Sequence, residues 1–149
     1  GIIVESTYRL LPADIRAELL LRIQKKLLAL KIKDNFLIYA LIISFFHSLL
    51  EEFYWRFFIF NSWKKYFSKN KINFAHFISA LAFALHHIVI TIYFFDVVLG
   101  IVMGLSVLIV GFLWQFAYEK DKSLTNIWLN HILIDCWLMS FAFRALHLL

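Results

Sequence analysis

Long hydrophobic runs separated by short polar stretches are the dominant pattern of this chain. Four such runs cover about residues 35–62, 73–93, 95–117 and 125–148. A bilayer core about 30 Å thick is crossed by about 20 helical residues, so each run is long enough to span it. None of them alternates between apolar and polar residues, as the ~10-residue strands of a membrane β-barrel do. The pattern predicts an all-α protein, a polytopic transmembrane helix bundle of about four spans.

A different pattern precedes the first run, over residues 12–33. Apolar residues recur there every three or four positions, while charged residues occupy the other side, which is typical of an amphipathic helix. Pro12 suits the first helical position, and Asp14 lies close behind it. This segment is too highly charged to span, so we expect an interfacial helix. The predicted organisation is an N-terminal segment, residues 1–34, followed by one transmembrane domain, residues 35–149.

Composition supports a membrane protein and excludes several other classes. Hydrophobic residues make up 62% of the 149, and the net charge is +5. The basic residues lie beside the apolar runs, which favours contact with anionic lipid headgroups and not with nucleic acid. Cys136 is the single cysteine, so neither an intramolecular disulfide nor a cysteine-based metal site is expected. No signal peptide is recognisable, and the distribution of basic residues does not determine the membrane orientation.

Two adjacent carboxylates interrupt the first run in the segment EEFYWR. Ionised side chains at membrane depth cost about 2.5–3.5 kcal/mol each on insertion scales, so they usually have a function. Glu51 and Glu52 point about 100° apart on a helix, and Glu52 can form an i,i+4 ion pair with Arg56. Glu51 then faces elsewhere as a candidate base, with His47 one turn before it. The alternative is that all three side chains snorkel to an interface.

Two further spans carry polar side chains in the segments FALHH and HILID. Phe83 and His87 are four residues apart and share a helix face, whereas His86 points about 100° away. His131 and Asp135 are also four residues apart and can form an oriented hydrogen-bonded pair or ligate a metal. The third span has Gly100, Gly104 and Gly111 instead, which favours close helix packing. A carboxylate, imidazoles and oriented donors together are the groups needed for general base and oxyanion chemistry.

Taken in order, these segments resemble the motifs of a known family. EEFYWR is similar to EExxxR, FALHH to FxxxH and HILID to HxxxN/D. The chain thus resembles the CAAX protease and bacteriocin-processing (CPBP, or Abi) family of glutamic-type intramembrane proteases over about residues 35–148. The resemblance implies a membrane-embedded hydrolase, a CAAX protease that cleaves peptide bonds by intramembrane proteolysis.

The resemblance also implies roles for individual residues. Glu51 is expected to activate water with the help of His87, while His131 and Asp135 polarise the scissile carbonyl and stabilise the oxyanion. Supporting roles are implied for Glu52, Arg56 and Phe83. Asp135 departs from the pattern, since CAAX-cleaving members carry Asn there. A carboxylate donates a hydrogen bond only when protonated, so Asp135 can instead orient His131.

Three functions are compatible with these residues. The favoured one is an intramembrane endopeptidase without cofactor or metal, acting on a peptide or lipidated-peptide substrate of CAAX or leader-peptide type. The second is a zinc-dependent protease using Glu51, His87, His131 and Asp135 as ligands, although HExxH is absent. The third is a non-catalytic membrane binding or bacteriocin-immunity protein. The expected location is the cytoplasmic membrane of a prokaryote, and the oligomeric state is not predicted.

Overall fold

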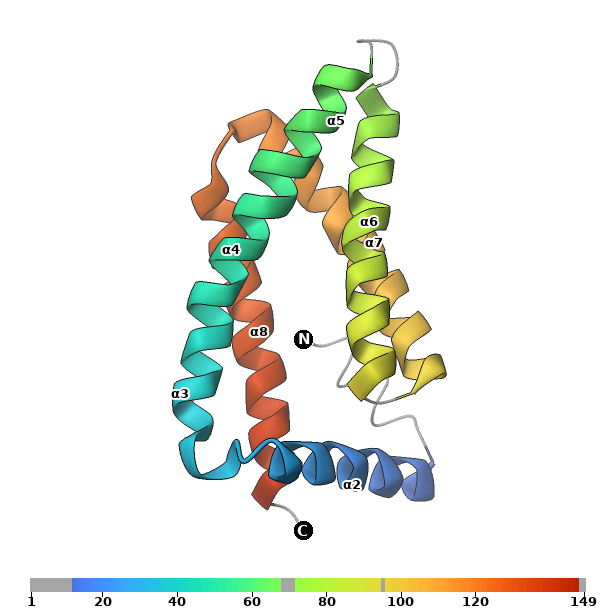
Figure 1. Cartoon of the computed structure of the whole chain (residues 1–149), viewed down its shortest axis with the longest axis vertical. Coiled ribbons are helices and arrows are strands. Elements are labelled where there is room, and N and C mark those ends of the chain that lie inside the picture. The colour runs from blue at the N-terminus through green and yellow to red at the C-terminus, as the bar shows by residue number, and fades with distance from the viewer. Residues whose placement is uncertain (1–11, 68–71, 95, 148–149) are drawn as a thin grey trace. The chain divides into compact units, whose positions relative to one another are not determined.

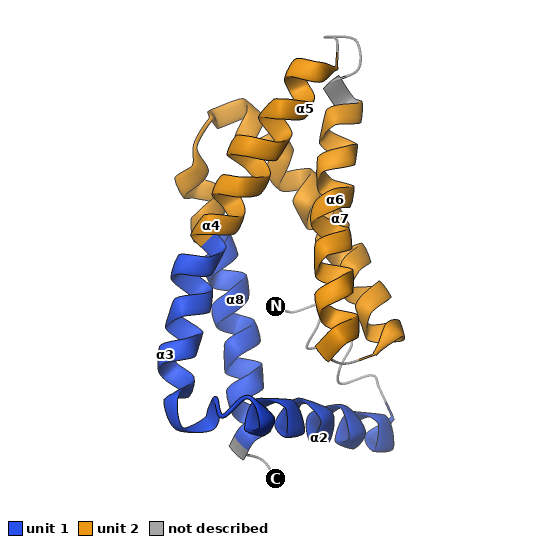
Figure 2. Cartoon of the chain, in the orientation of Figure 1, with its two compact units in different colours: residues 1–48, 130–149 blue, residues 49–129 orange. Residues whose placement is uncertain are grey.

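The structure is a computed structural model that describes residues 12–67, 72–94 and 96–147. These residues form helices and short connections, and none of them lies in a strand (Figure 1). The chain divides into two compact units, one of residues 1–48 and 130–149 and one of residues 49–129 (Figure 2). The predicted all-α class is confirmed.

The predicted amphipathic segment forms helix α2, Ala13–Ala29. Pro12, predicted as the first helical residue, is the N-cap and lies one position before the helix begins. None of the residues of α2 is buried. The helix ends four residues before the predicted boundary because Lys31 adopts a left-handed conformation, φ 55°. The Lys31 and Ile32 N–H groups then bond the carbonyls of Leu28 and Leu27, closing a Schellman motif. Glycine usually occupies this left-handed position, so the sequence offered no stop signal there.

The first hydrophobic run is one continuous helix with two wide turns. It contains two π-helical stretches on either side of the short α-helix that carries the two glutamates. Hydrogen bonds in a π-helix join residues five apart, and such stretches are frequent at functional sites. In chain order the segments are η1 (Lys33–Asn35), α3 (Phe36–Leu41), η2 (Ile42–His47), α4 (Ser48–Glu52), η3 (Phe53–Phe60) and α5 (Asn61–Tyr66).

Side-chain donors accompany the π-helical stretches. Ser48 Oγ donates to the carbonyl of Ser44 in η2, at 2.5 Å. Asn61 Nδ2 and Ser62 Oγ donate to carbonyls of η3, those of Phe57 and Phe58, each at 2.8 Å. Polar side chains that bond carbonyls one turn back compete with regular helical bonding and often bend helices. The hydroxyl and amide groups of this otherwise apolar run thus add hydrogen bonds where the backbone pattern changes.

Three further helices follow, α6 (Ile72–Phe94), α7 (Val97–Asp121) and α8 (Leu124–His147). Asp96 caps α7 by accepting a hydrogen bond from the N–H of Leu99, at 2.9 Å. Ser123 Oγ accepts in the same way from the N–H of Asn126 near the start of α8, at 3.4 Å. The segment YEKD lies in the polar stretch after the third hydrophobic run, yet it is helical because lysine and glutamate favour helix. Helix α7 ends only where Lys122 turns left-handed.

Within residues 49–129, helices α6 and α7 pack closely through the glycines of α7. Gly100, Gly104 and Gly111 are buried. A methyl group at Gly100 or Gly104 would overlap Ile92 or Ile88 of α6. The small-residue packing face that the sequence indicated is therefore confirmed. In the other unit, Phe36 of α3 and Phe143 of α8 are in ring contact, with centroids 5.6 Å apart.

Three helices of the described residues are long and apolar enough to cross a membrane, namely Lys33–Tyr66, Phe74–Phe94 and Val97–Asp121. The fourth predicted span is confirmed as a helix of 24 residues, α8. It is not among the three because Asn126, Asn130, His131 and Asp135 make its first half more polar. That α8 also crosses the membrane stays a prediction.

Candidate active site

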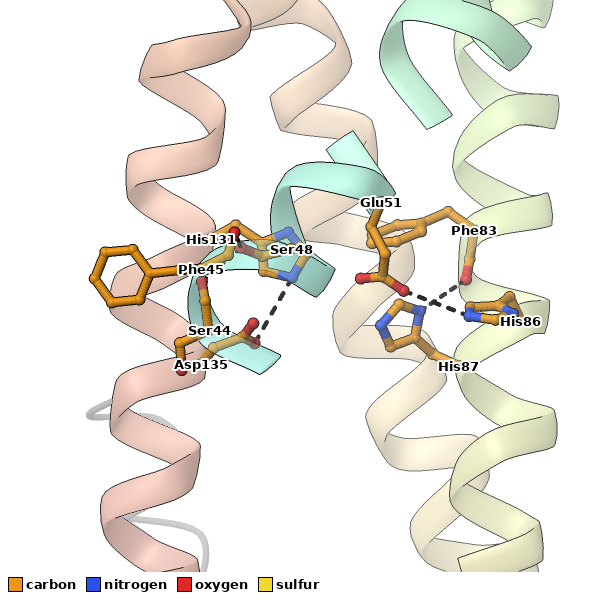
Figure 3. A network of polar contacts seen from close by, with 9 residues as sticks. All are labelled: Ser44, Phe45, Ser48, Glu51, Phe83, His86, His87, His131 and Asp135. Carbon is orange, nitrogen blue, oxygen red and sulfur yellow. Dashed lines mark hydrogen bonds and ion pairs between the residues drawn. The ribbon is translucent and has the colours of Figure 1, made fainter. Parts of the chain in front are cut away.

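Glu51 lies on α4 with 8% of its surface exposed and faces α6. Its Oε1 is 3.4 Å from Nε2 of His86, within ion-pair distance. In Figure 3 the carboxylate points toward the two adjacent imidazoles of α6, those of His86 and His87. A buried carboxylate needs a donor or a cation as partner, and His86 supplies one.

His87 is oriented by its own helix. Its Nδ1 lies 3.0 Å from the carbonyl oxygen of Phe83, one turn back. Because a carbonyl can only accept, Nδ1 carries the proton of the neutral ring, and Nε2 is then the nitrogen with the lone pair. The rings of His87 and His86 are 5.4 Å apart and nearly perpendicular. The contact of Nδ1 with the Phe83 carbonyl thus favours one tautomer for the imidazole of the second motif.

Glu52 and Arg56 form the ion pair that the sequence predicted. Arg56 Nε is 3.0 Å from Glu52 Oε2, and both side chains are fully buried. The guanidinium carbon also lies 4.4 Å from the ring centre of Phe83 and 5.6 Å from that of Trp114, distances typical of cation–π contacts. The snorkelling alternative does not fit a pair without solvent exposure.

Phe83 connects the residues of the first two motifs. Its buried ring touches Arg56 on η3 and meets the ring of His87 in an edge-to-face contact, with centroids 4.5 Å apart. Trp55 packs on the same ring at 5.5 Å. On α7, a methyl group at Gly111 would come within 3.0 Å of Phe83. Phe83 on α6 is thus packed against η3 and α7, and its ring contacts both Arg56 and His87.

The third motif lies on α8, in the unit formed by residues 1–48 and 130–149. His131 is buried, and its Nε2 is 3.7 Å from Oδ1 of Asp135, one turn on (Figure 3). This matches the predicted orientation of an i,i+4 pair. The structure brings the first two motifs together within residues 49–129 and pairs the two residues of the third motif with each other. The convergence of all three motifs on one site stays a prediction.

Two polar contacts were not anticipated from the sequence. One is the contact of His86 with Glu51, since His86 points about 100° away from the face shared by Phe83 and His87. The other joins His76 of α6 to Glu119 of α7, with 2.7 Å between Nε2 and Oε2, while Lys64 of α5 bonds the other oxygen of Glu119. The adjacent histidines of FALHH were the only local signal for the first contact. Nothing local marks the second, because its members are far apart in sequence.

The positions of the histidine, cysteine and acidic side chains bear on the zinc hypothesis. Among residues 12–67, 72–94 and 96–147, no three histidine, cysteine or acidic side chains form a group that could hold a metal ion. The zinc hypothesis is therefore left to a direct chelation experiment.

One comparison with known proteins found a match. The family model described as type II CAAX prenyl endopeptidase Rce1-like matches residues 33–137. This range contains every residue of the three motifs. No curated protein and no solved structure matches the chain.

Proposed function

The chain belongs to the Rce1-like family of type II CAAX prenyl endopeptidases, and from this premise we propose that it hydrolyses peptide bonds of membrane-associated substrates with a water activated by Glu51. The match bears out the resemblance noted from the motifs. With three apolar helices, the chain is an integral membrane protein of a protease family. The glutamic mechanism, the substrate and the residue roles are our proposal.

One observation carries the proposal most directly, the contact between Glu51 on α4 and the imidazoles of α6. Glu51 is mostly withdrawn from solvent, yet His86 lies 3.4 Å from its carboxylate. A general base needs a carboxylate or imidazole within hydrogen-bond reach of the water that it deprotonates. Glu52 is less suited to that role because it is fully buried in its ion pair with Arg56. The division of labour between the adjacent glutamates therefore favours Glu51 as the base.

The proposed reaction begins with a water held between Glu51 and His87. Glu51 takes one proton while the water oxygen attacks the scissile carbonyl carbon, giving a tetrahedral oxyanion. The C–N bond then breaks, and the proton passes from Glu51 to the leaving amine. His87 suits a water-orienting role because its Nδ1 bonds the Phe83 carbonyl, so that Nε2 accepts.

His131 and Asp135 are proposed to stabilise the oxyanion. Asp135 lies 3.7 Å from His131 Nε2, close enough to favour the orientation and positive charge of the imidazole. A protonated histidine is a donor at both nitrogens and can stabilise a developing negative charge. This assigns Asp135 to orienting His131, in agreement with its being a carboxylate where CAAX-cleaving members have an amide.

The family and the membrane location support a proposal for the substrate class. We propose a peptide held at the bilayer, either prenylated near its C-terminus in CAAX fashion or presented as a leader peptide. The N-terminal segment, residues 1–34, is proposed to lie along the membrane surface through α2, and residues 35–149 to form the protease domain.

The test uses the purified chain in liposomes with a fluorogenic prenylated CAAX peptide, its unprenylated form and a leader-type peptide. Glu51→Gln should lower cleavage at least ~10³-fold, since it removes the base, and should leave the thermal unfolding midpoint unchanged. Glu18→Gln is the matched control, because Glu18 on α2 is exposed and pairs with Arg22. A chelator should leave cleavage intact.

Other outcomes would redirect the assignment. Loss of cleavage on chelation, with recovery in Zn²⁺, would support the metalloprotease instead. Full cleavage by Glu51→Gln would remove Glu51 as the base. A non-catalytic binding function is indicated if two results are obtained together. The wild-type chain cuts none of the three peptides, and cells that carry Glu51→Gln behave like cells that carry the wild-type chain.

A further inference from the structure

His86 occupies one of the unspecified positions of the second motif, and it lies 3.4 Å from the Glu51 carboxylate. Its Nε2 is 3.4 Å from Glu51 Oε1, and 40% of its side chain is exposed. The partner is thus the less enclosed member of the pair. A partly exposed imidazole gains less from packing than a buried one, so its contact with the carboxylate needs another explanation.

The two histidines of α6 are held by different partners. His87 is bonded to the backbone of its own helix through Nδ1. His86 instead reaches across to the other helix. Arg56 forms its ion pair with Glu52, and His86 contacts Glu51. The contact with His86 is thus one that can set the direction of the Glu51 carboxylate.

Trp55 limits where the His86 ring can go. The indole lies one turn after Glu51 on the same helix, and its ring centre is 5.8 Å from that of His86. On the other side, the His87 ring lies 5.4 Å away. An imidazole confined between two rings offers its Nε2 in one direction, and that direction leads to the Glu51 carboxylate. All these residues lie within residues 49–129.

We propose that His86 is a positioning residue that donates from Nε2 to Glu51 and sets the carboxylate in the orientation needed to deprotonate water. The proposal rests on the proposed function, because it acts through Glu51. Orientation of a catalytic group is worth a large share of the rate, and a displacement of 1 Å can cost about 10²-fold. His86 has no role in binding the substrate under this proposal, so its loss should affect kcat and leave KM unchanged.

The experiment compares His86→Leu with His86→Gln in the liposome assay. His86→Leu removes the donor and should lower kcat about 10²-fold with KM within twofold. His86→Gln keeps an amide donor, so its kcat should be at least tenfold higher than that of His86→Leu. Leu85→Ala is the control, since Leu85 is exposed and adjacent to His86 on α6; it should behave as wild type.

A second measurement follows the carboxylate itself. With ¹³C-labelled glutamate, the infrared carboxylate band that disappears in Glu51→Gln identifies Glu51. His86→Leu should shift that band, and His86→Gln should restore it. This readout does not require cleavage, so it tests the contact even if the proposed peptidase activity fails.

The results separate the two proposals. Unchanged kcat and an unchanged Glu51 band in His86→Leu would overturn the positioning role, while loss of cleavage in Glu51→Gln would still support the protease. Equal losses in His86→Leu and His86→Gln would also overturn it, because a donated hydrogen bond would then not be the cause.

Discussion

Two carboxylate–imidazole pairs join α6 to a neighbouring helix, and they differ in the side chains that surround the carboxylate. Glu119 has both of its oxygens engaged, one by His76 and one by Lys64. Glu51 faces His86, while the nearest arginine forms its ion pair with Glu52. A carboxylate held by a lysine and a histidine is a poor proton acceptor. Under our proposal, the Glu119 cluster is structural and the Glu51 cluster is reactive.

The surroundings of the two imidazoles support the same distinction. His76 is fully buried, stacks on Phe116 at 4.1 Å and meets the edge of Phe60 at 4.6 Å. The Glu119 cluster also connects three helices, α5, α6 and α7, near their polar ends. His86 is partly exposed, with 40% of its side chain accessible. We propose that these similar residue pairs serve two purposes because their surroundings differ.

The largest expected effect comes from replacing one histidine by leucine in each region, His87 beside the Glu51 site and His76 in the Glu119 cluster. His87→Leu should lower kcat about 10³-fold, since it removes a group that orients the water, and should leave the unfolding midpoint close to wild type. His76→Leu should retain kcat within threefold but lower stability by about 1–3 kcal/mol, since it removes a buried polar contact. Cleavage kinetics and thermal unfolding of both variants test this, and a reversed result would contradict the comparison.

Breaking the ion pair beside Glu51 should have the next largest effect. Arg56→Leu leaves Glu52 buried without its cation, and we expect a loss of about 3–5 kcal/mol. The double variant Glu52→Leu/Arg56→Leu removes both charges and should recover most of that stability. Unfolding in detergent measures both. If the double variant is as unstable as the single one, the cation–π contacts of Arg56 with Phe83 and Trp114 matter more than its charge pair.

Disturbing the helix packing that both clusters share should have an intermediate effect. Gly104→Ala places a methyl group against Ile88 of α6, and overpacking of this kind costs about 1–3 kcal/mol. Because α6 carries His76, His86 and His87, activity should fall together with stability. Leu105→Ala, at an exposed neighbouring position, is the control. If Gly104→Ala is as stable as the wild type, the close approach of α6 and α7 at this glycine does not contribute to stability.

The smallest effect is expected for Glu119→Gln. Glu119 is a quarter exposed, and partly exposed ion pairs contribute about 0.2–1 kcal/mol, so stability should fall by no more than that. Cleavage should stay within twofold of wild type, in contrast to Glu51→Gln. The stability difference should shrink at high salt, since screening weakens exposed pairs. A large loss of cleavage would show that the Glu119 cluster takes part in the reaction.

Much of the helical layout followed from hydropathy alone. The runs predicted at 73–93 and 125–148 are helices Ile72–Phe94 and Leu124–His147, within one residue at either end. Boundaries in charged segments were less accurate. The helices α5 and α7 continue through WKKY and YEKD because lysine and glutamate favour helix, and α2 ends at a left-handed lysine that no local signal marks.

The candidate site was predicted where its contacts are local. The Glu52–Arg56 pair and the His131–Asp135 pair each join residues one turn apart, so helix periodicity was sufficient to foresee them. The two π-helical stretches around Glu51 were not foreseen, because no residue type demands them. They change the direction in which side chains leave the first helix.

The sequence by itself thus determined the helices, the ion pair and the motif residues, since hydrophobic periodicity and i,i+4 spacing are properties of a single segment. Only the tertiary structure decided that His86 faces Glu51 and that His76 and Lys64 engage Glu119. Such contacts depend on how one helix is rotated against another. That rotation is set by packing, here by the glycines of α7 against α6 and by the wide turns of the first helix.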